Sequence, residues 1–146
     1  MQSLDVLRNL ADVDRDILEK TLRDFLKCRA VSDFERYLTF LSPAVEITIV
    51  GDRKLHPYSG CYVGHEGALQ LVRRIDVEFE YIESRIVDIV VDHDRAVVRR
   101  VKTMRQNGTR EIRHLHMCTW VRFQNGLIIE IVEYSDTALT VFLSQP

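Results

Sequence analysis

One acidic residue near the end of the chain, Glu133, lies where a carboxylate could do acid–base chemistry. It follows Ile129 and Ile131 at alternate positions, so on a β-strand the three side chains share one face. Burial on an apolar face disfavours the ionised carboxylate and raises its pKa towards the range that proton transfer needs. A structural ion pair with an arginine explains such a glutamate equally well, and the sequence leaves both explanations open.

Two histidines, His114 and His116, are spaced i and i+2 and therefore share a face of any strand that contains them. This spacing can hold a metal ion, but the sequence offers no evident third ligand, so we predict no metal. Each histidine could instead have a structural role. The functional alternatives are that His116 is a partner of Glu133 and that His114 lines a pocket.

Three further polar residues, Asp52, His56 and Tyr58, lie in the segment 51–64, which is rich in Gly, Pro, Asp and Ser. This composition predicts a loop, and we expect the loop to form the rim of a pocket. Asp52 directly follows a glycine, and for this residue ordinary turn chemistry is the stronger explanation.

The first half of the chain has the apolar spacing of helices. Residues 14–30 present one apolar face, and further helices are predicted over 2–10, 34–41 and 65–75. Ser32 and Glu35 fit a capping box that starts the second of these helices, and Pro43 follows its end. A strand over 45–49 separates this helix from the loop.

The second half of the chain has the pattern of long strands followed by a short closing helix capped by Asp136. The breaks between the strands include Asn107-Gly108 and Asn125-Gly126, which are strong hairpin signals, so we predict an antiparallel meander. The predicted strands are 79–91, 96–106, 110–124 and 127–135.

The last hairpin predicts which side chains line the inner face of the sheet. A two-residue turn at Asn125-Gly126 places Trp120 opposite Ile131 and Cys118 opposite Glu133. We expect Trp120 to pack in the core or to stack on a flat ligand, and Cys118 to act as a small buried apolar group. The predicted inner face is His114, His116, Cys118, Trp120, Ile129, Ile131 and Glu133.

The preceding hairpin leaves one alternative open. A two-residue turn at Asn107-Gly108 places Arg99 opposite His116, whereas a three-residue turn that includes Gln106 places Arg100 there. One of the two arginines therefore faces the pocket, as an orienting or anion-stabilising group.

The opposite face of these strands is also partly apolar, which predicts a second layer over it. Helices can cover only one side of the sheet, so we predict a homodimer formed through the other side.

Composition excludes several classes of protein. The chain has 146 residues, 20 basic against 22 acidic, and a net charge of −2, which does not fit a nucleic-acid or membrane partner. The N-terminus is interrupted by charges, no apolar run is long enough to span a bilayer, and the three cysteines show no metal-binding spacing. We therefore expect one domain over 1–146, in the cytoplasm, with reduced thiols.

The order of these elements resembles the nuclear transport factor 2-like superfamily, and within it the SnoaL-like domains related to polyketide cyclases. The resemblance is carried by residues 58–68 (YSGCYVGHEGA) and 125–136 (NGLIIEIVEYSD). It implies an α+β roll: N-terminal helices packed on a curved, mostly antiparallel sheet, with a central pocket. It specifies the fold well and the chemistry poorly.

The family's site residues carry over only in part. Ketosteroid isomerase-like members place a tyrosine donor where this chain has Phe25, and an acid where it has Cys118 or Thr119, so the resemblance disfavours steroid isomerisation. Their base follows the first strand, where only Asp52 is available.

Epoxide hydrolase-like members of the superfamily give a closer match. They place an acid at the position of Glu133 and an arginine at that of Arg100, but their second acid falls on Lys102.

These residues lead to two functional hypotheses. The first is a cofactor-independent enzyme that acts on a small apolar molecule by proton transfer, as an isomerase, cyclase, dehydratase or hydrolase. The second is a non-catalytic module that binds a ligand or partner with the same fold.

Overall fold

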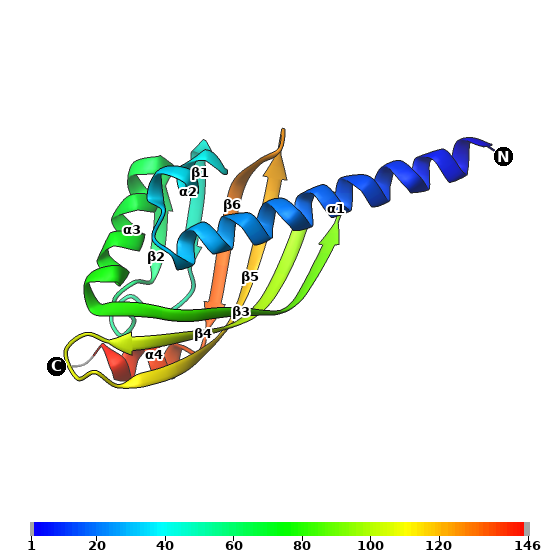
Figure 1. The fold of residues 1–146 in the computed structure, drawn as a ribbon. Coiled ribbons are helices and arrows are strands. Elements are labelled where there is room, and N and C mark those ends of the chain that lie inside the picture. The colour runs from blue at the N-terminus through cyan, green and yellow to red at the C-terminus, as the bar shows by residue number, and fades with distance from the viewer. Residues whose placement is uncertain (1, 145–146) are drawn as a thin grey trace.

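The computed structural model describes residues 2–144, without the side chains of residues 2, 3, 5 and 7–13, and it confirms the predicted α+β fold (Figure 1). In chain order the elements are α1 (Gln2–Ala30), α2 (Phe34–Thr39), β1 (Leu41–Ile49), β2 (Gly60–Val63), α3 (Gly64–Glu78), β3 (Phe79–Asp92), β4 (Arg95–Gln106), β5 (Ile112–Gln124), β6 (Leu127–Ser135) and α4 (Thr137–Leu143).

The six strands form one curved sheet in the order β2-β1-β6-β5-β4-β3. All neighbouring pairs are antiparallel except β1 and β6. Helices α1 and α3 cover one face, with α1 against β3 and α3 against β1, and the hydrophobic core lies between these layers. None of the helices in the described part of the chain is long and apolar enough to cross a membrane.

Helix α1 is longer than predicted because residues 2–10 continue into it instead of forming a separate helix. Its C-terminal half buries Leu22, Phe25 and Leu26 against the sheet, whereas Leu4 and Val6 are exposed. Figure 1 shows the N-terminal half of α1 extending past the edge of the sheet.

The predicted start of the second helix is wrong by one residue. Ser32 has a positive φ of 57° and closes α1, so it cannot adopt the extended backbone of an N-cap. Asp33 caps α2 instead, because its carboxylate accepts from the backbone N–H of Arg36. The helix also ends earlier, and β1 begins at Leu41 and contains Pro43 within an irregular stretch.

A β-bulge in β6 reverses the predicted face of β5. Gln124 does face Leu127, as the two-residue turn requires, but Phe123 then pairs with Ile128 and Arg122 with Glu130, which leaves Ile129 as an extra residue. Beyond the bulge the pairing moves by one residue, and a shift of one residue moves every side chain to the other face.

The inner face of β5 therefore carries Leu115, Met117, Thr119 and Val121, all buried. The prediction that His114, His116, Cys118 and Trp120 share a face with Glu133 is wrong. His114, His116 and Cys118 are exposed and Trp120 is half-buried, all on the outer face.

Neither turn considered for the β4–β5 hairpin is correct, because five residues separate Gln106 from Ile112. Arg100 pairs with Met117, and Val101 is the residue opposite His116. Arg100 is buried on the inner face and Arg99 is exposed on the outer face, which settles the alternative in favour of Arg100.

Candidate functional site

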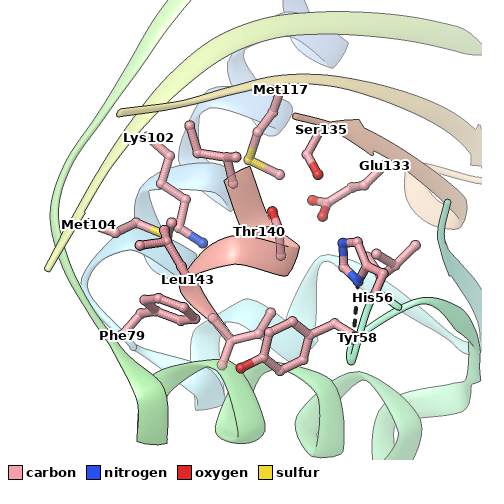
Figure 2. A pocket seen from close by; sticks show the side chains of 13 residues that line it. His56, Tyr58, Phe79, Lys102, Met104, Met117, Glu133, Ser135, Thr140 and Leu143 are labelled. Carbon is pink, nitrogen blue, oxygen red and sulfur yellow. Dashed lines mark hydrogen bonds between the residues drawn. The ribbon is translucent and has the colours of Figure 1, made fainter. Parts of the chain in front are cut away.

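A cavity of about 50 Å³ lies between the inner face of the sheet, α4 and the loop that precedes β2 (Figure 2). This volume is enough for a few water molecules or a small organic group. Most of its lining is apolar, and the polar side chains in it are His56, Tyr58, Lys102, Glu133, Ser135 and Thr140. The apolar lining includes Ile49, Phe79, Met104, Leu115, Met117 and Leu143.

Glu133 is held on the inner face by Arg100, whose Nη2 donates to Oε1 at 3.0 Å. The two residues come from β6 and β4, and the strand between them contributes Thr119, which pairs with Glu133. The Arg100 side chain is 3% exposed and that of Glu133 is 21% exposed, so the carboxylate is the part of the pair that the cavity can reach.

His56 presents a hydrogen-bond donor to the same cavity. The backbone N–H of Tyr58 donates to its Nδ1 at 3.2 Å, which places the hydrogen of the neutral ring on Nε2. Burial lowers the pKa of His56 and favours this neutral form. Nε2 is buried and makes no hydrogen bond to any described residue, and Figure 2 shows the ring facing the space beside Glu133 and Thr140.

The loop that carries His56 is organised by Asp52, as its turn chemistry predicts. The Asp52 carboxylate accepts from the N–H of Lys54 at 2.8 Å, and its carbonyl accepts from the N–H of His56 at 2.7 Å. Asp52 is exposed and does not line the cavity, so the prediction that it is a pocket residue is wrong.

Lys102 and Tyr81 form a second polar pair, which the sequence analysis missed. The Lys102 Nζ lies 3.8 Å from the centroid of the Tyr81 ring. Burial lowers the pKa of Lys102, with Arg29 adding to the effect. Burial alone would raise the pKa of Tyr81, but the positive charges of Lys102, Arg29 and Arg100 outweigh it and lower that pKa.

A deeper cavity of about 40 Å³ lies beside the first, and the two have the lining residues Ile75, Lys102 and Glu133 in common. It lies between α1, α2, α3 and the sheet, and Phe25 and Ile131 contribute to its apolar lining. Its polar lining consists of Arg29, Tyr37, Tyr81, Arg100, Lys102, Thr119 and Glu133.

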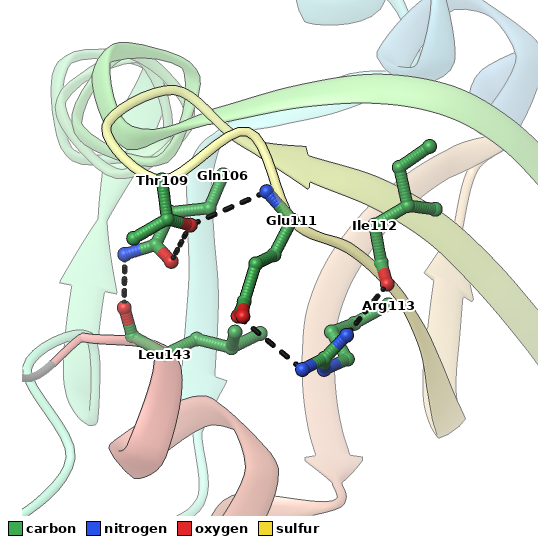
Figure 3. Close-up of polar contacts among 6 residues, drawn as sticks. All are labelled: Gln106, Thr109, Glu111, Ile112, Arg113 and Leu143. Carbon is green, nitrogen blue, oxygen red and sulfur yellow. Dashed lines mark hydrogen bonds and ion pairs between the residues drawn. The ribbon is translucent and has the colours of Figure 1, made fainter.

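Helix α4 closes the first cavity and is held at both ends. Asp136 caps it by accepting from the N–H of Leu139 at 3.1 Å, which confirms the predicted cap. At the other end the Gln106 amide donates to the carbonyl of Leu143 at 2.5 Å (Figure 3). The side-chain oxygen Oε1 of Gln106 also accepts from Thr109 Oγ1, so the turn between β4 and β5 is tied to the helix.

Of the predicted site residues, the structure brings together Glu133, Arg100, His56, Tyr58, Ile131 and Phe25 around the two cavities. Those on the outer face have other neighbours: His114 Nδ1 lies 2.9 Å from Thr103 Oγ1, and the Arg95 guanidinium lies over the Trp120 ring. Among the side chains that the structure describes, no three from His, Cys, Asp or Glu come close enough to hold a metal ion together.

Lys102 could have been found from the sequence once Arg100 was placed. Residues two apart on a strand share a face, so an inward Arg100 implies an inward Lys102 and Met104. Arg29 and Tyr81 carried no comparable signal, because their placement depends on how α1 crosses β3.

The sequence profile of the family described as "SnoaL-like domain" matches residues 22–131. No curated protein sequence matches the chain significantly.

Several solved structures share the fold at low sequence identity. A protein of unknown function from Burkholderia pseudomallei, described as NTF2-like, has a TM-score of 0.77 at 20% identity, with 89% of this chain and 98% of that chain covered. TerC, crystallised with polyporic acid, has a TM-score of 0.77 at 15% identity, covering 87% and 97%. An epoxide hydrolase from M. tuberculosis has a TM-score of 0.71 at 17% identity, covering 88% and 89%.

Proposed function

The chain belongs to the SnoaL-like domain family, and we propose that it is an enzyme that carries out acid–base chemistry on a small, largely apolar substrate without an organic cofactor. One observation carries this proposal. The Glu133 carboxylate and the unpaired Nε2–H of His56 face the same apolar cavity. A base and a hydrogen-bond donor around one small space are the minimum that proton abstraction beside a carbonyl group requires.

Glu133 is the proposed base. Arg100 holds Oε1, and Oε2 makes no hydrogen bond to the residues that the structure describes, so Oε2 is the atom that would take a proton. Arg100 also fixes the direction of the carboxylate, which is the positioning that proton transfer needs.

His56 and Lys102 are the proposed stabilisers of the negative charge that develops. When Oε2 removes a proton from a carbon beside a carbonyl, the C–H electron pair moves to the carbonyl oxygen. The Nε2–H of His56 and the ammonium of Lys102 line the cavity in which that oxygen would lie. Return of the proton from Glu133 to a different carbon completes an isomerisation.

Hydrolysis of an epoxide has less support than isomerisation. The similar structure from M. tuberculosis is an epoxide hydrolase, and the pairing of Glu133 with Arg100 is consistent with that chemistry. However, Lys102 occupies the position where the resemblance implies a second acid, so a water molecule here would meet a cation in place of a second carboxylate.

A non-catalytic binding protein is the second candidate, and one observation favours it. Glu133 is already engaged with Arg100, and a structural ion pair would hold the two side chains in the same way. The two candidates differ in whether Glu133 exchanges a proton with a bound molecule.

Hydrogen–deuterium exchange into small ketones tests the proposal. The protein is incubated in D₂O with ketones from acetone to cyclohexanone, and loss of the α-C–H signal is followed by NMR. We expect exchange above the buffer rate, reduced about 100-fold or more by Glu133→Gln because the base is lost.

Glu130→Gln is the matched control, since Glu130 lies on the same strand but pairs with Arg122 on the outer face. This variant is expected to keep the wild-type exchange rate. If no ketone exchanges faster than in buffer, or if both variants exchange at the wild-type rate, Glu133 is not the base and the binding protein is favoured.

A further inference from the structure

Three buried hydrogen-bond donors line the deeper cavity without a partner among the described residues. They are Nη2 of Arg29, Nε of Arg100 and Oγ1 of Thr119. These residues are 5%, 2% and 1% exposed. Each unpaired buried donor costs stability, so three around one cavity indicate that an acceptor binds between them.

The charges around this cavity do not balance. Arg29, Arg100 and Lys102 supply three cations, and all three are buried. Two carboxylates face them: Asp76 lies 3.0 Å from Arg29 Nη1, and Glu133 lies 3.0 Å from Arg100 Nη2. With Lys102 protonated and Tyr81 neutral, one positive charge is therefore left in excess, and a buried excess charge is unfavourable unless an anion compensates it.

The pKa values of Tyr81 and Lys102 are both lowered, which is the direction that an excess of positive charge favours. The three cations lower the pKa of Tyr81 despite its burial, so the phenol loses its proton more readily than an ordinary tyrosine. Burial and the arginines lower the pKa of Lys102. An anion in the cavity would raise the pKa of each group towards its ordinary value.

The size and lining of the cavities restrict which anions can bind. An excess of one charge matches a monoanion, and a volume of about 40 Å³ suits a small planar group with two acceptor oxygens. The surrounding side chains from α1 and α3, including Phe25, Leu71 and Ile75, are apolar, and the first cavity continues the apolar lining past Lys102. A carboxylate with a short apolar remainder has this combination of properties.

We propose that the deeper cavity binds a carboxylate, and that the ligand of this protein is a small monocarboxylic acid. Its carboxylate lies between Arg29, Arg100 and Thr119, and its apolar remainder extends past Lys102 to Glu133 and His56. This inference deepens the proposed function and rests on it for the reactive part of the ligand, whereas the binding of the carboxylate stands on the three donors alone.

Calorimetric titration of the wild-type protein with hexanoate and with hexanamide tests the inference. The two probes have the same shape and differ in charge. We expect hexanoate to bind about tenfold more tightly or better, because charge-assisted hydrogen bonds to arginine are stronger than neutral ones. Equal affinities, or no binding by either probe because only water occupies the cavity, would overturn the inference.

Arg29→Met and Arg23→Met localise the effect. Both arginines lie on α1, but Arg23 is exposed and pairs with Glu19. The preference for hexanoate should disappear in Arg29→Met and remain in Arg23→Met. A preference retained in a folded Arg29→Met protein would overturn the assignment, and if that variant does not fold, the wild-type comparison of the two probes decides alone.

A spectroscopic signal provides an independent readout. Hexanoate should move the near-ultraviolet tyrosinate titration of the wild-type protein to higher pH, and Tyr81→Phe should remove this shift. If hexanoate binds as expected while Glu133→Gln leaves ketone exchange unchanged, the carboxylate site stands and the proposed acid–base function fails. If Glu133→Gln slows ketone exchange as expected but hexanoate binds no more tightly than hexanamide, the proposed acid–base function stands and the carboxylate site fails.

Discussion

Two arginine–glutamate pairs join strands of the same sheet on opposite faces, and their surroundings differ. On the outer face Arg122 donates to Glu130 at 3.2 Å, with side chains 37% and 30% exposed. On the inner face Arg100 donates to Glu133 at 3.0 Å, with side chains 3% and 21% exposed. Water and salt screen the pair on the outer face. In the pair on the inner face, each charged side chain depends on the other for its stabilisation, because little water reaches them. The face of the strand, and not the type of residue, therefore separates a candidate site from an ordinary surface.

Removing the arginine from each pair is expected to have the largest effect on stability. Arg100→Met leaves Glu133 without its partner and should lower the free energy of unfolding by about 3 kcal/mol. Arg122→Met on the outer face should lower it by less than about 1 kcal/mol. Urea denaturation of the two variants measures the difference, and equal losses would show that burial does not distinguish the pairs.

A double variant separates the contribution of charge in the inner pair from the contribution of packing. Arg100→Met with Glu133→Leu removes both charges and should recover part of the stability lost in Arg100→Met, because no unpaired carboxylate remains. If the double variant is less stable than Arg100→Met by the full cost of a second core substitution, the pair contributes through packing and not through charge.

The outer face carries a further prediction, which concerns assembly. Val90, Val97, Trp120 and Val132 form a row across four neighbouring strands, and Val90 and Val97 are exposed. Because such a row is self-complementary under a two-fold axis, we propose that a second copy of the chain covers it. Light scattering should find a dimer for the wild-type protein and a monomer for Val97→Glu. A wild-type monomer would show that this face stays in water.

Most of the fold could be predicted from the sequence because its signals are local. Alternating apolar residues and the Asn-Gly turns gave the strands of the meander, and Asp136 gave the cap of α4. Residues 2–10 and the cap of α2 were less well predicted. Ser32 and Asp33 are both good capping residues, and only the left-handed backbone of Ser32 decides between them.

Which residues of β5 lie on the inner face could not be predicted, because this depends on one extra residue in β6. The bulge at Ile129 has no marker in a run of β-branched and apolar side chains, yet it moves His116 and Cys118 outward and Thr119 inward. Glu133 was identified from the apolar alternation of its own strand, and the family resemblance matched both Glu133 and Arg100. Arg29 and Tyr81 belong to elements far apart in the sequence, and only their packing brings them to the cavity.

The smallest expected effect concerns His56, whose burial contrasts with the exposed histidines of the outer face. Its pKa is lower in the folded protein than its ordinary value, so in acid the unfolded chain takes up the proton first. The stability that neutral His56 provides is therefore complete above about pH 6.5 and is lost as the pH falls below that value.

His56→Asn keeps an acceptor for the N–H of Tyr58 but cannot be protonated there. The fall in unfolding free energy between about pH 7 and pH 5 should be smaller in this variant than in the wild-type protein. An unchanged fall would mean that folding does not lower the pKa of His56, and burial would then not favour the neutral ring that the proposed reaction needs.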